Sequence, residues 1–250
     1  HTFFFFLFTW DVGLHYIGDL HPKTAVRKMY DYVTGQKLKW QKIPDPFQYL
    51  VFPERKIAVR STQKEYADEL KKSFPLEAEK IDRYFFDVRR VQKYSPLFML
   101  IGKAPEFLRS VLKKIFASRY RYFEMRTDEF FDELGLSQEL RAVLDAQCGD
   151  YGLAMHESAL LAHIAIATHY LRGAYYPTGG SGQIVRAILP EILNAGGKIM
   201  VRHEVQEILL SEDQKTAIGV RVLDRRDQST HEFFAPLIYS NAGVHITYQK

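Results

Sequence analysis

The side chains that could do chemistry in this 250-residue sequence match few familiar catalytic patterns. Its nine histidines and single cysteine, Cys148, are the first candidates, but one cysteine forms neither an internal disulfide nor a metal cluster. The sequence has no Ser-His-Asp pattern, no phosphate-binding P-loop and no paired cysteine ligands. The absence of these protein-based catalytic patterns is compatible with an enzyme in which a bound cofactor carries the chemistry.

Three histidines lie within or beside a helix that we predict over 157–171. His156 and His163 are seven residues apart and could share a helix face. A metal site normally needs closer spacing and further ligands, so we predict no metal site. We expect these two side chains and His169 to line a pocket or to be buried and hydrogen-bonded.

Two glycine-containing segments could bring the backbone close to a flat ligand. One runs from Asp11 to Gly18, where two glycines interrupt a strand-like run. The other, Tyr175 to Gly182, forms a loop before a predicted helix over 181–194. A tight contact inside the protein core is the alternative explanation for the first segment.

Hydrophobic periodicity predicts the elements that must position these segments. Helices are expected over 24–33, 63–74, 76–94, 107–116, 127–134 and 137–148, in addition to the two named above. Pro190 should kink or end the helix over 181–194 early, and Gly196-Gly197 is a stop signal. Strands are expected at 198–201, 204–210 and 217–223, with a return strand at 237–239.

Composition, charge and the length of apolar runs indicate a globular protein and give no sign of a membrane span or a signal peptide. A hydrophobic content of 46% is enough for a sizeable core, and a formal charge of +4 does not by itself imply nucleic acid. The apolar run Phe3–Phe8 is far shorter than the roughly 20 residues that span a bilayer. It also lacks the flanks of a signal peptide.

Five short motifs, in this order and at this spacing, resemble a family of FAD-dependent oxidoreductases. The family includes phytoene desaturases, carotenoid isomerases and all-trans-retinol 13,14-reductase (retinol saturase). The motifs are Tyr176-Pro-Thr-Gly-Gly, Gly196-Gly-Lys-Ile, Val205-Gln-Glu-Ile, Ile218-Gly-Val and Ser240-Asn-Ala-Gly. His1-Thr-Phe and the segment 11–18 are similar to the retinol saturase branch in particular. The family's G-x-G-x-x-G fingerprint is absent, so we expect the chain to be an internal fragment of a longer flavoprotein.

The resemblance implies an α/β fold, as a fragment of a two-domain FAD-dependent oxidoreductase. Residues 1–18 and 173–250 would belong to a Rossmann-like flavin domain, and residues 19–172 to an inserted, mostly helical substrate domain. Gly13 would approach the flavin ring, and Val205, Asn241 and Ala242 would border the cofactor. Plain sheet core is the alternative explanation for Val205 and Ala242.

The resemblance also implies FAD as cofactor, NAD(P)H as a candidate reductant, and a retinoid or carotenoid polyene as the apolar substrate. His15 and Tyr16 are the candidate acids for saturating a double bond. Desaturation and cis–trans isomerisation are alternatives within the enzyme class. A non-catalytic, membrane-associated lipid-binding module that has lost the flavin is an alternative outside it. We expect the fragment alone to be inactive.

The stretch 98–126 combines an apolar stripe at helical spacing with an excess of cations. The cations are Lys103, Arg109, Lys113, Lys114, Arg119, Arg121 and Arg126. A basic amphipathic segment suits a membrane surface, and a solvated helix over a core is the competing explanation. No motif supports nucleic-acid binding. We predict peripheral membrane association through this stretch, at the endoplasmic reticulum if the source is eukaryotic.

Overall fold

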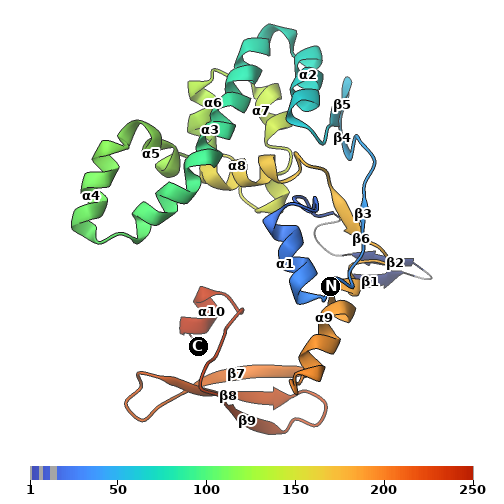
Figure 1. Ribbon diagram of the computed structural model, residues 1–250, viewed down its shortest axis with the longest axis vertical. Helices are drawn as coiled ribbons and strands as arrows, with labels where there is room; N and C mark the ends of the chain where they lie inside the picture. The colour runs from blue at the N-terminus through green and yellow to red at the C-terminus, as the bar shows by residue number, and fades with distance from the viewer. Residues whose placement is uncertain (1, 6–7, 12–15, 250) are drawn as a thin grey trace. The chain divides into compact units, whose positions relative to one another are not determined.

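The computed structural model describes residues 2–5, 8–11 and 16–249, and it divides the chain into two compact units (Figure 1). The first unit is His1–Glu191 and the second is Ile192–Lys250. Helices and short strands occur in both units, which confirms a mixed helix and sheet protein.

The first unit consists of a helical body and three two-stranded antiparallel ribbons. The ribbons are β1 (Thr2–Phe5) with β2 (Phe8–Asp11), β3 (Trp40–Lys42) with β6 (Tyr175–Pro177), and β4 (Gln48–Phe52) with β5 (Arg55–Val59). The helices are α1 (Ala25–Val33), α2 (Gln63–Ser73), α3 (Ala78–Lys103), α4 (Glu106–Ile115), α5 (Ala117–Glu124), α6 (Thr127–Glu133), α7 (Gln138–Leu144) and α8 (Leu160–His169).

Side-chain caps explain where several predicted helices begin. The Thr24 hydroxyl accepts a hydrogen bond from the Arg27 amide at the start of α1, and Thr62 accepts one from Glu65 at the start of α2. Ser137 caps α7 in the same way, through the Leu140 amide. These starts agree with the sequence-based predictions.

Helix α3 is longer than predicted because it continues through Pro96 to Lys103. A proline inside a helix leaves the carbonyl four residues earlier without its usual donor. Here that carbonyl belongs to Gln92, and the Ser95 hydroxyl donates a hydrogen bond to it at 3.0 Å. The local sequence therefore satisfies the group that the proline releases.

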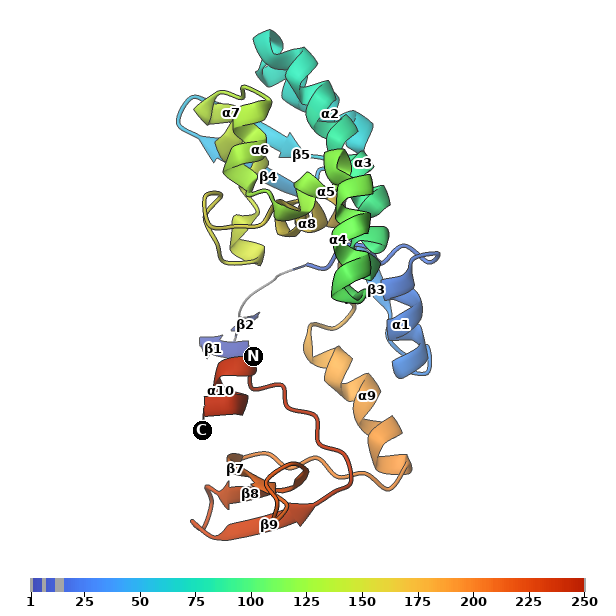
Figure 2. The ribbon, with the colours of Figure 1, turned by 90° about the vertical axis from the view of Figure 1, so that its left-hand side faces the viewer.

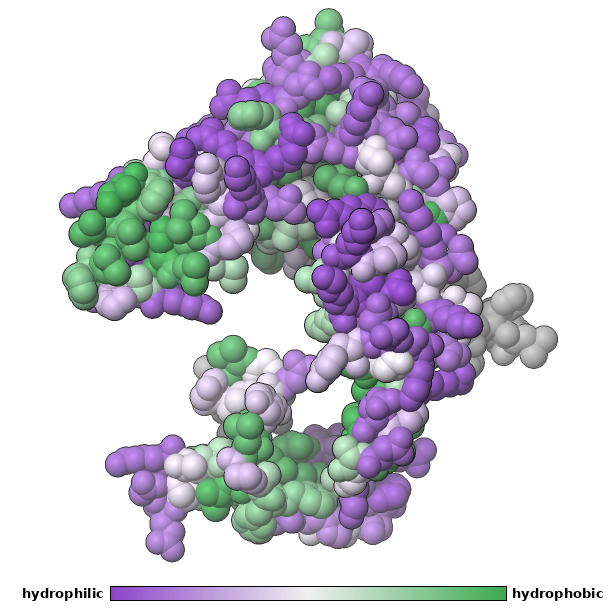
Figure 3. Space-filling view, in the orientation of Figure 1, coloured by the Kyte–Doolittle hydropathy of each residue, from purple (hydrophilic) through white to green (hydrophobic). Residues whose placement is uncertain are grey.

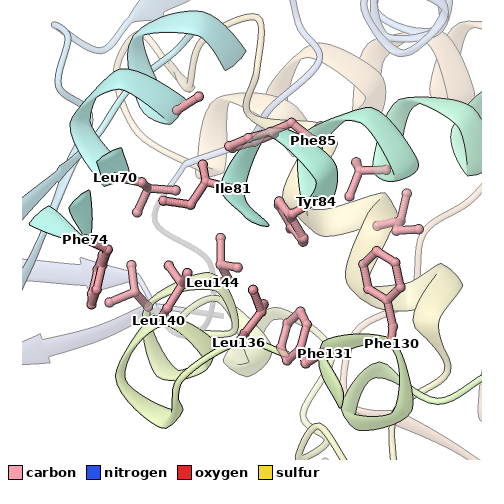
Figure 4. Packing of buried hydrophobic residues seen from close by; sticks show 14 of the residues in the cluster. Leu70, Phe74, Ile81, Tyr84, Phe85, Phe130, Phe131, Leu136, Leu140 and Leu144 are labelled. Atoms are coloured by element: carbon pink, nitrogen blue, oxygen red, sulfur yellow. The ribbon is translucent and has the colours of Figure 1, made fainter. Parts of the chain in front are cut away.

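The main core lies where α3 packs against α2 and α6 to α8 (Figure 4). Its largest fully buried side chains include Tyr84, Phe130, Phe131 and Leu140. Rings from α3 and α6 meet there, with Tyr84 and Phe131 centroids 6.3 Å apart. Burial of such aromatic and aliphatic side chains is the main stabilising contribution to the first unit.

Segments distant in sequence meet at β6. Tyr175 exchanges two 2.8 Å backbone hydrogen bonds with Ile17, and its strand pairs with β3 through Trp40 and Pro177. This pairing fixes residues 16–18 beside the end of α8.

The second unit is an antiparallel meander, visible in Figures 1 and 2. Its strands are β7 (His203–Leu210), β8 (Ala217–Asp224) and β9 (Thr230–Phe234), followed by α10 (Val244–Gln249). Helix α9 (Gly182–Asn194) leads into it from the first unit. Helix α9 does not end early at Pro190, as one of the two expectations for this proline had it. It continues to Asn194, and Gly196 then turns the chain with φ +79°.

The two strands expected at 198–201 and 237–239 are not formed, so those predictions were wrong. Both segments are apolar, but a strand exists only beside a partner, and in the described part of the chain neither segment pairs with one. Val201 is 73% exposed and Tyr239 is 88% exposed.

Candidate functional site

The candidate acid Tyr16 lies in an aromatic cluster of the first unit. Its ring packs edge-on against Phe47 and Tyr170, at centroid distances of 5.6 and 5.2 Å. Its hydroxyl donates a hydrogen bond to Oε1 of Gln48 at 2.8 Å. Burial is the main reason why the pKa of Tyr16 is raised, so the phenol stays protonated at neutral pH. His15 and Gly13, the neighbouring predicted site residues, lie outside the described residues.

A second phenol that the sequence reasoning missed stands beside Tyr16. The Tyr170 hydroxyl donates a 2.7 Å hydrogen bond to Oδ2 of Asp150. Burial, with this carboxylate as the next cause, raises the pKa of Tyr170. No motif marks Tyr170, since a tyrosine after a helix is a common sequence feature.

Gly18 contacts a protein ring rather than leaving space for a ligand. Its amide donates a hydrogen bond to Nε2 of His169 at 3.0 Å. A Cβ atom on Gly18 would stand 2.3 Å from the His169 carbonyl oxygen and 2.7 Å from Cδ2 of its ring. For this glycine the tight core contact is the correct explanation.

His169 also lines a groove of about 790 Å³ between α3 and α8. Apolar side chains from three helices form much of its wall: Met99, Phe123, Leu161, Ile164 and Ala165. Polar and charged side chains line the rest of the groove, both along α3 and around the end of α8, where Arg172 pairs with Asp19 at 3.5 Å. Those contributed by α3 are Arg89, Gln92 and Ser95. A groove of this volume, with apolar side chains on one part of its wall and polar ones on another, is large enough for a small molecule.

The other two histidines of this region have different environments. His163 is buried, with Nε2 2.9 Å from the Tyr84 hydroxyl and Nδ1 3.6 Å from Oδ1 of Asp145. The expectation of a buried, hydrogen-bonded histidine is therefore confirmed for His163, and a pocket-lining one for His169. His156 is exposed. Within the described residues, no group of three or more His, Cys, Asp or Glu could hold a metal ion.

In the second unit, three predicted cofactor residues line one pocket. Val205, Asn241 and Ala242 border a volume of about 300 Å³, together with Ile208 and Ile246. The β7–β8 register shifts between Val205 and Glu207, which is a β-bulge. Bulges interrupt the ladder and often lie beside functional sites.

The predicted membrane segment forms a helical hairpin with an exposed apolar face. Figure 3 shows this face as a green patch over α4 and its surroundings. Its exposed side chains are Met99, Leu100, Phe107, Leu108, Val111 and Ile115, and we call this set the α4 patch. Among the described residues, no helix is both long and apolar enough to cross a membrane.

The cations of this segment are not equivalent. Lys113 pairs with Glu124 at 2.6 Å, and Arg121 pairs with Glu133 at 2.6 Å. Lys103 and Lys114 are exposed, and within the described part of the chain no carboxylate pairs with either. These two are the cations most available to an external anion.

Comparison with known proteins finds relatives of similar sequence. No family model matches it. It is 36% identical over 258 residues to a Danio rerio protein named all-trans-retinol 13,14-reductase, covering 100% of this chain and 42% of the relative. The Homo sapiens protein of the same name is 31% identical over 96% of the chain and 40% of the relative. Over almost its whole length, the chain is therefore similar to part of proteins named all-trans-retinol 13,14-reductase.

These relatives confirm the resemblance seen in the motifs. Prolycopene isomerase 1, chloroplastic, from an Oncidium hybrid cultivar is 25% identical over 97% of the chain and 42% of that relative. The chain thus spans about two fifths of the length of these relatives.

Proposed function

We propose that the chain is part of a flavin-dependent oxidoreductase that acts on a carbon–carbon double bond of a polyene lipid, a retinoid or carotenoid. The observation that carries the proposal is the similarity, over the whole chain, to proteins named all-trans-retinol 13,14-reductase. Identity to these reductases exceeds identity to the prolycopene isomerase, so we favour saturation over isomerisation.

Saturation adds a hydride to one carbon and a proton to the other. Bound FAD, reduced by NAD(P)H, would supply the hydride. The chain's own contribution would be the proton and the exclusion of water. Tyr16 is the candidate donor, because its phenol stays protonated at neutral pH and its ring is held by Phe47 and Tyr170. Gln48 would take part by orienting the Tyr16 hydroxyl.

The pocket of the second unit fits the adenine end of FAD. Its lining is mostly apolar, and the bulge after Val205 interrupts the β7–β8 ladder where adenine would need hydrogen bonds. The lining contains Glu207 but neither lysine nor arginine, so it does not supply an anion site for the pyrophosphate. We therefore expect weak FAD binding by this chain alone.

Residues 1–18 and 173–250 would serve the flavin, and 19–172 the substrate. Within the second group, the α3–α8 groove would hold the polyene, because its wall joins apolar side chains of three helices. Met99 belongs to both the groove and the α4 patch, so a lipid could pass from one to the other.

A direct test uses the complete reading frame that carries this sequence, reconstituted with FAD. Incubation with all-trans-retinol and a reductant should give a product heavier by two hydrogen atoms, detected by mass spectrometry. A protein that stays colourless after reconstitution would contradict the flavin assignment. Replacing Tyr16 with Phe should slow turnover and leave flavin content unchanged.

Peripheral membrane binding through the α4 patch has its own test. Each cation near an anionic surface adds about 1 kcal/mol, screened by salt. Changing Lys103 and Lys114 to Glu should therefore weaken binding to anionic vesicles at low salt by at least tenfold. The matched control changes Lys23 and Lys28, two lysines outside the hairpin, and should leave binding unchanged. Unchanged sedimentation of the first variant would favour the solvated-helix explanation.

A further inference from the structure

We infer that His169 presents one fixed hydrogen-bond donor to the ligand of the α3–α8 groove and, with Asp19, selects a polyene that ends in a hydroxyl group. The inference deepens the proposed function and rests on the groove being the polyene site. It assigns recognition of the lipid's polar end to two named side chains.

The Gly18 amide determines the tautomer of His169. Because it donates to Nε2 at 3.0 Å, this nitrogen must carry a lone pair. The ring proton of the neutral imidazole then sits on Nδ1. Burial, the main cause, lowers the pKa of His169 below its ordinary value, so the neutral form persists at neutral pH.

The imidazole is also held in place on several sides. Gly18 approaches the His169 backbone so closely that no Cβ would fit, and Ile17 is anchored to Tyr175 by two hydrogen bonds. The Tyr170 ring packs edge-on at 4.9 Å from the imidazole centroid. A donor held this rigidly loses little entropy when a ligand binds.

The remaining donor has no partner inside the protein. No described residue accepts a hydrogen bond from Nδ1 of His169, although the side chain lines the groove. Asp19 lines the same part of the groove and offers a carboxylate, whose contact with Arg172 is long at 3.5 Å. A donor beside an acceptor matches a hydroxyl group, which both accepts and donates a hydrogen bond.

Part of the apolar wall lies on the same helix as His169. Leu161 lies eight residues before His169, which is roughly 12 Å along the axis of α8. Ile164 and Ala165 stand between them. The α8 side of the groove is therefore apolar over this length and polar at its end, whereas the α3 side carries Arg89, Gln92 and Ser95.

Two substitutions test the roles of the two ring nitrogens of His169 one at a time. In His169→Gln, the longer side chain can still accept the Gly18 hydrogen bond but has no donor at the position of Nδ1. In His169→Asn, the shorter amide places a donor near Nδ1 but no longer reaches Gly18. Binding is measured with the 250-residue chain through the absorbance and fluorescence of the polyene. The probes are all-trans-retinol, its hydrocarbon analogue without the hydroxyl group, and all-trans-retinoic acid.

The measured quantity is the ratio of the dissociation constants for hydrocarbon and alcohol. One neutral hydrogen bond is worth about a 3- to 10-fold change in that ratio. We expect His169→Gln to lower the ratio by this factor with the hydrocarbon affinity unchanged, and His169→Asn to preserve most of the ratio. Circular dichroism checks that both variants are folded.

Three results would overturn the inference. Equal ratios in the wild type and both variants would remove His169 from recognition and leave the polyene site standing. Tighter binding of the acid than of the alcohol would contradict selection of a hydroxyl by Asp19. Binding of neither alcohol nor hydrocarbon would overturn the inference together with the assignment of the groove.

Discussion

Replacing Gly18 with alanine tests the contact on which the arrangement of the first unit's site depends. The new methyl group would stand 2.3 Å from the carbonyl oxygen and 2.7 Å from the carbonyl carbon of His169. Both atoms belong to the backbone at the end of α8, so neither can rotate away. The two segments must separate, and the 3.0 Å hydrogen bond from the Gly18 amide to His169 is then lost.

The expected cost follows from these two effects. Forcing a methyl group into a packed contact costs about 1–3 kcal/mol, and a lost hydrogen bond adds about 1 kcal/mol. The free energy of unfolding of the Gly18→Ala variant should therefore fall by about 2–4 kcal/mol. For a unit of this size, that corresponds to a fall in melting temperature of roughly 5–15 °C.

Gly102→Ala is the matched control, because a Cβ at Gly102 would meet no atom within 4 Å and the residue lies in the last turn of α3. Alanine there should be neutral or stabilising by up to about 1 kcal/mol. Urea denaturation followed by circular dichroism gives both values. If Gly18→Ala unfolds within about 0.5 kcal/mol of the wild type, below the cost of a single lost hydrogen bond, the close approach to His169 is refuted.

Further predictions concern the core, the pH response and the groove. Tyr84→Phe leaves Nε2 of buried His163 without its 2.9 Å partner and should cost about 1–3 kcal/mol in urea denaturation, whereas an unchanged midpoint would show that the bond contributes nothing. Burial lowers the pKa of His169, so its contribution to stability is full above about pH 6.5 and is lost as the pH falls through the lowered pKa. The stability difference between wild type and His169→Gln should shrink accordingly on acidification, and a pH-independent difference would contradict this. Met99→Lys should weaken polyene binding by the groove, because it places a cation in the apolar part of the wall, and unchanged polyene binding would contradict the assignment of the groove.

Sequence alone predicted the helix boundaries that depend only on neighbouring residues. The helix starts at Thr24, Thr62 and Ser137 are visible as capping residues, and Gly196 marks the end of α9. The extension of α3 through Pro96 was missed, because it depends on a side-chain hydrogen bond from Ser95. The strands expected at 198–201 and 237–239 failed for another reason: pairing depends on a neighbouring strand, which periodicity does not report.

The candidate site was predictable only where a motif carried the information. The family motifs brought together Val205, Asn241 and Ala242, which line one pocket. Tyr170 was not identified as a site residue, and His169 was expected only to line a pocket or to be buried, because their contacts are with residues 16–18, about 150 positions earlier. A glycine in a strand indicates close approach, but not whether a ligand or a protein side chain approaches it.

The protonation states in the first unit agree with an uncharged substrate. Tyr16 and Tyr170 remain protonated because burial raises both pKa values, and His169 remains neutral because burial lowers its pKa. The α3–α8 groove is also lined by the charged side chains of Asp19, Arg89 and Arg172, and Asp19 pairs with Arg172 at 3.5 Å. Pairing reduces the cost of holding these two charges beside an apolar ligand. The neutral phenols and the neutral imidazole carry no such cost, and each can offer a proton or a hydrogen bond at a fixed position.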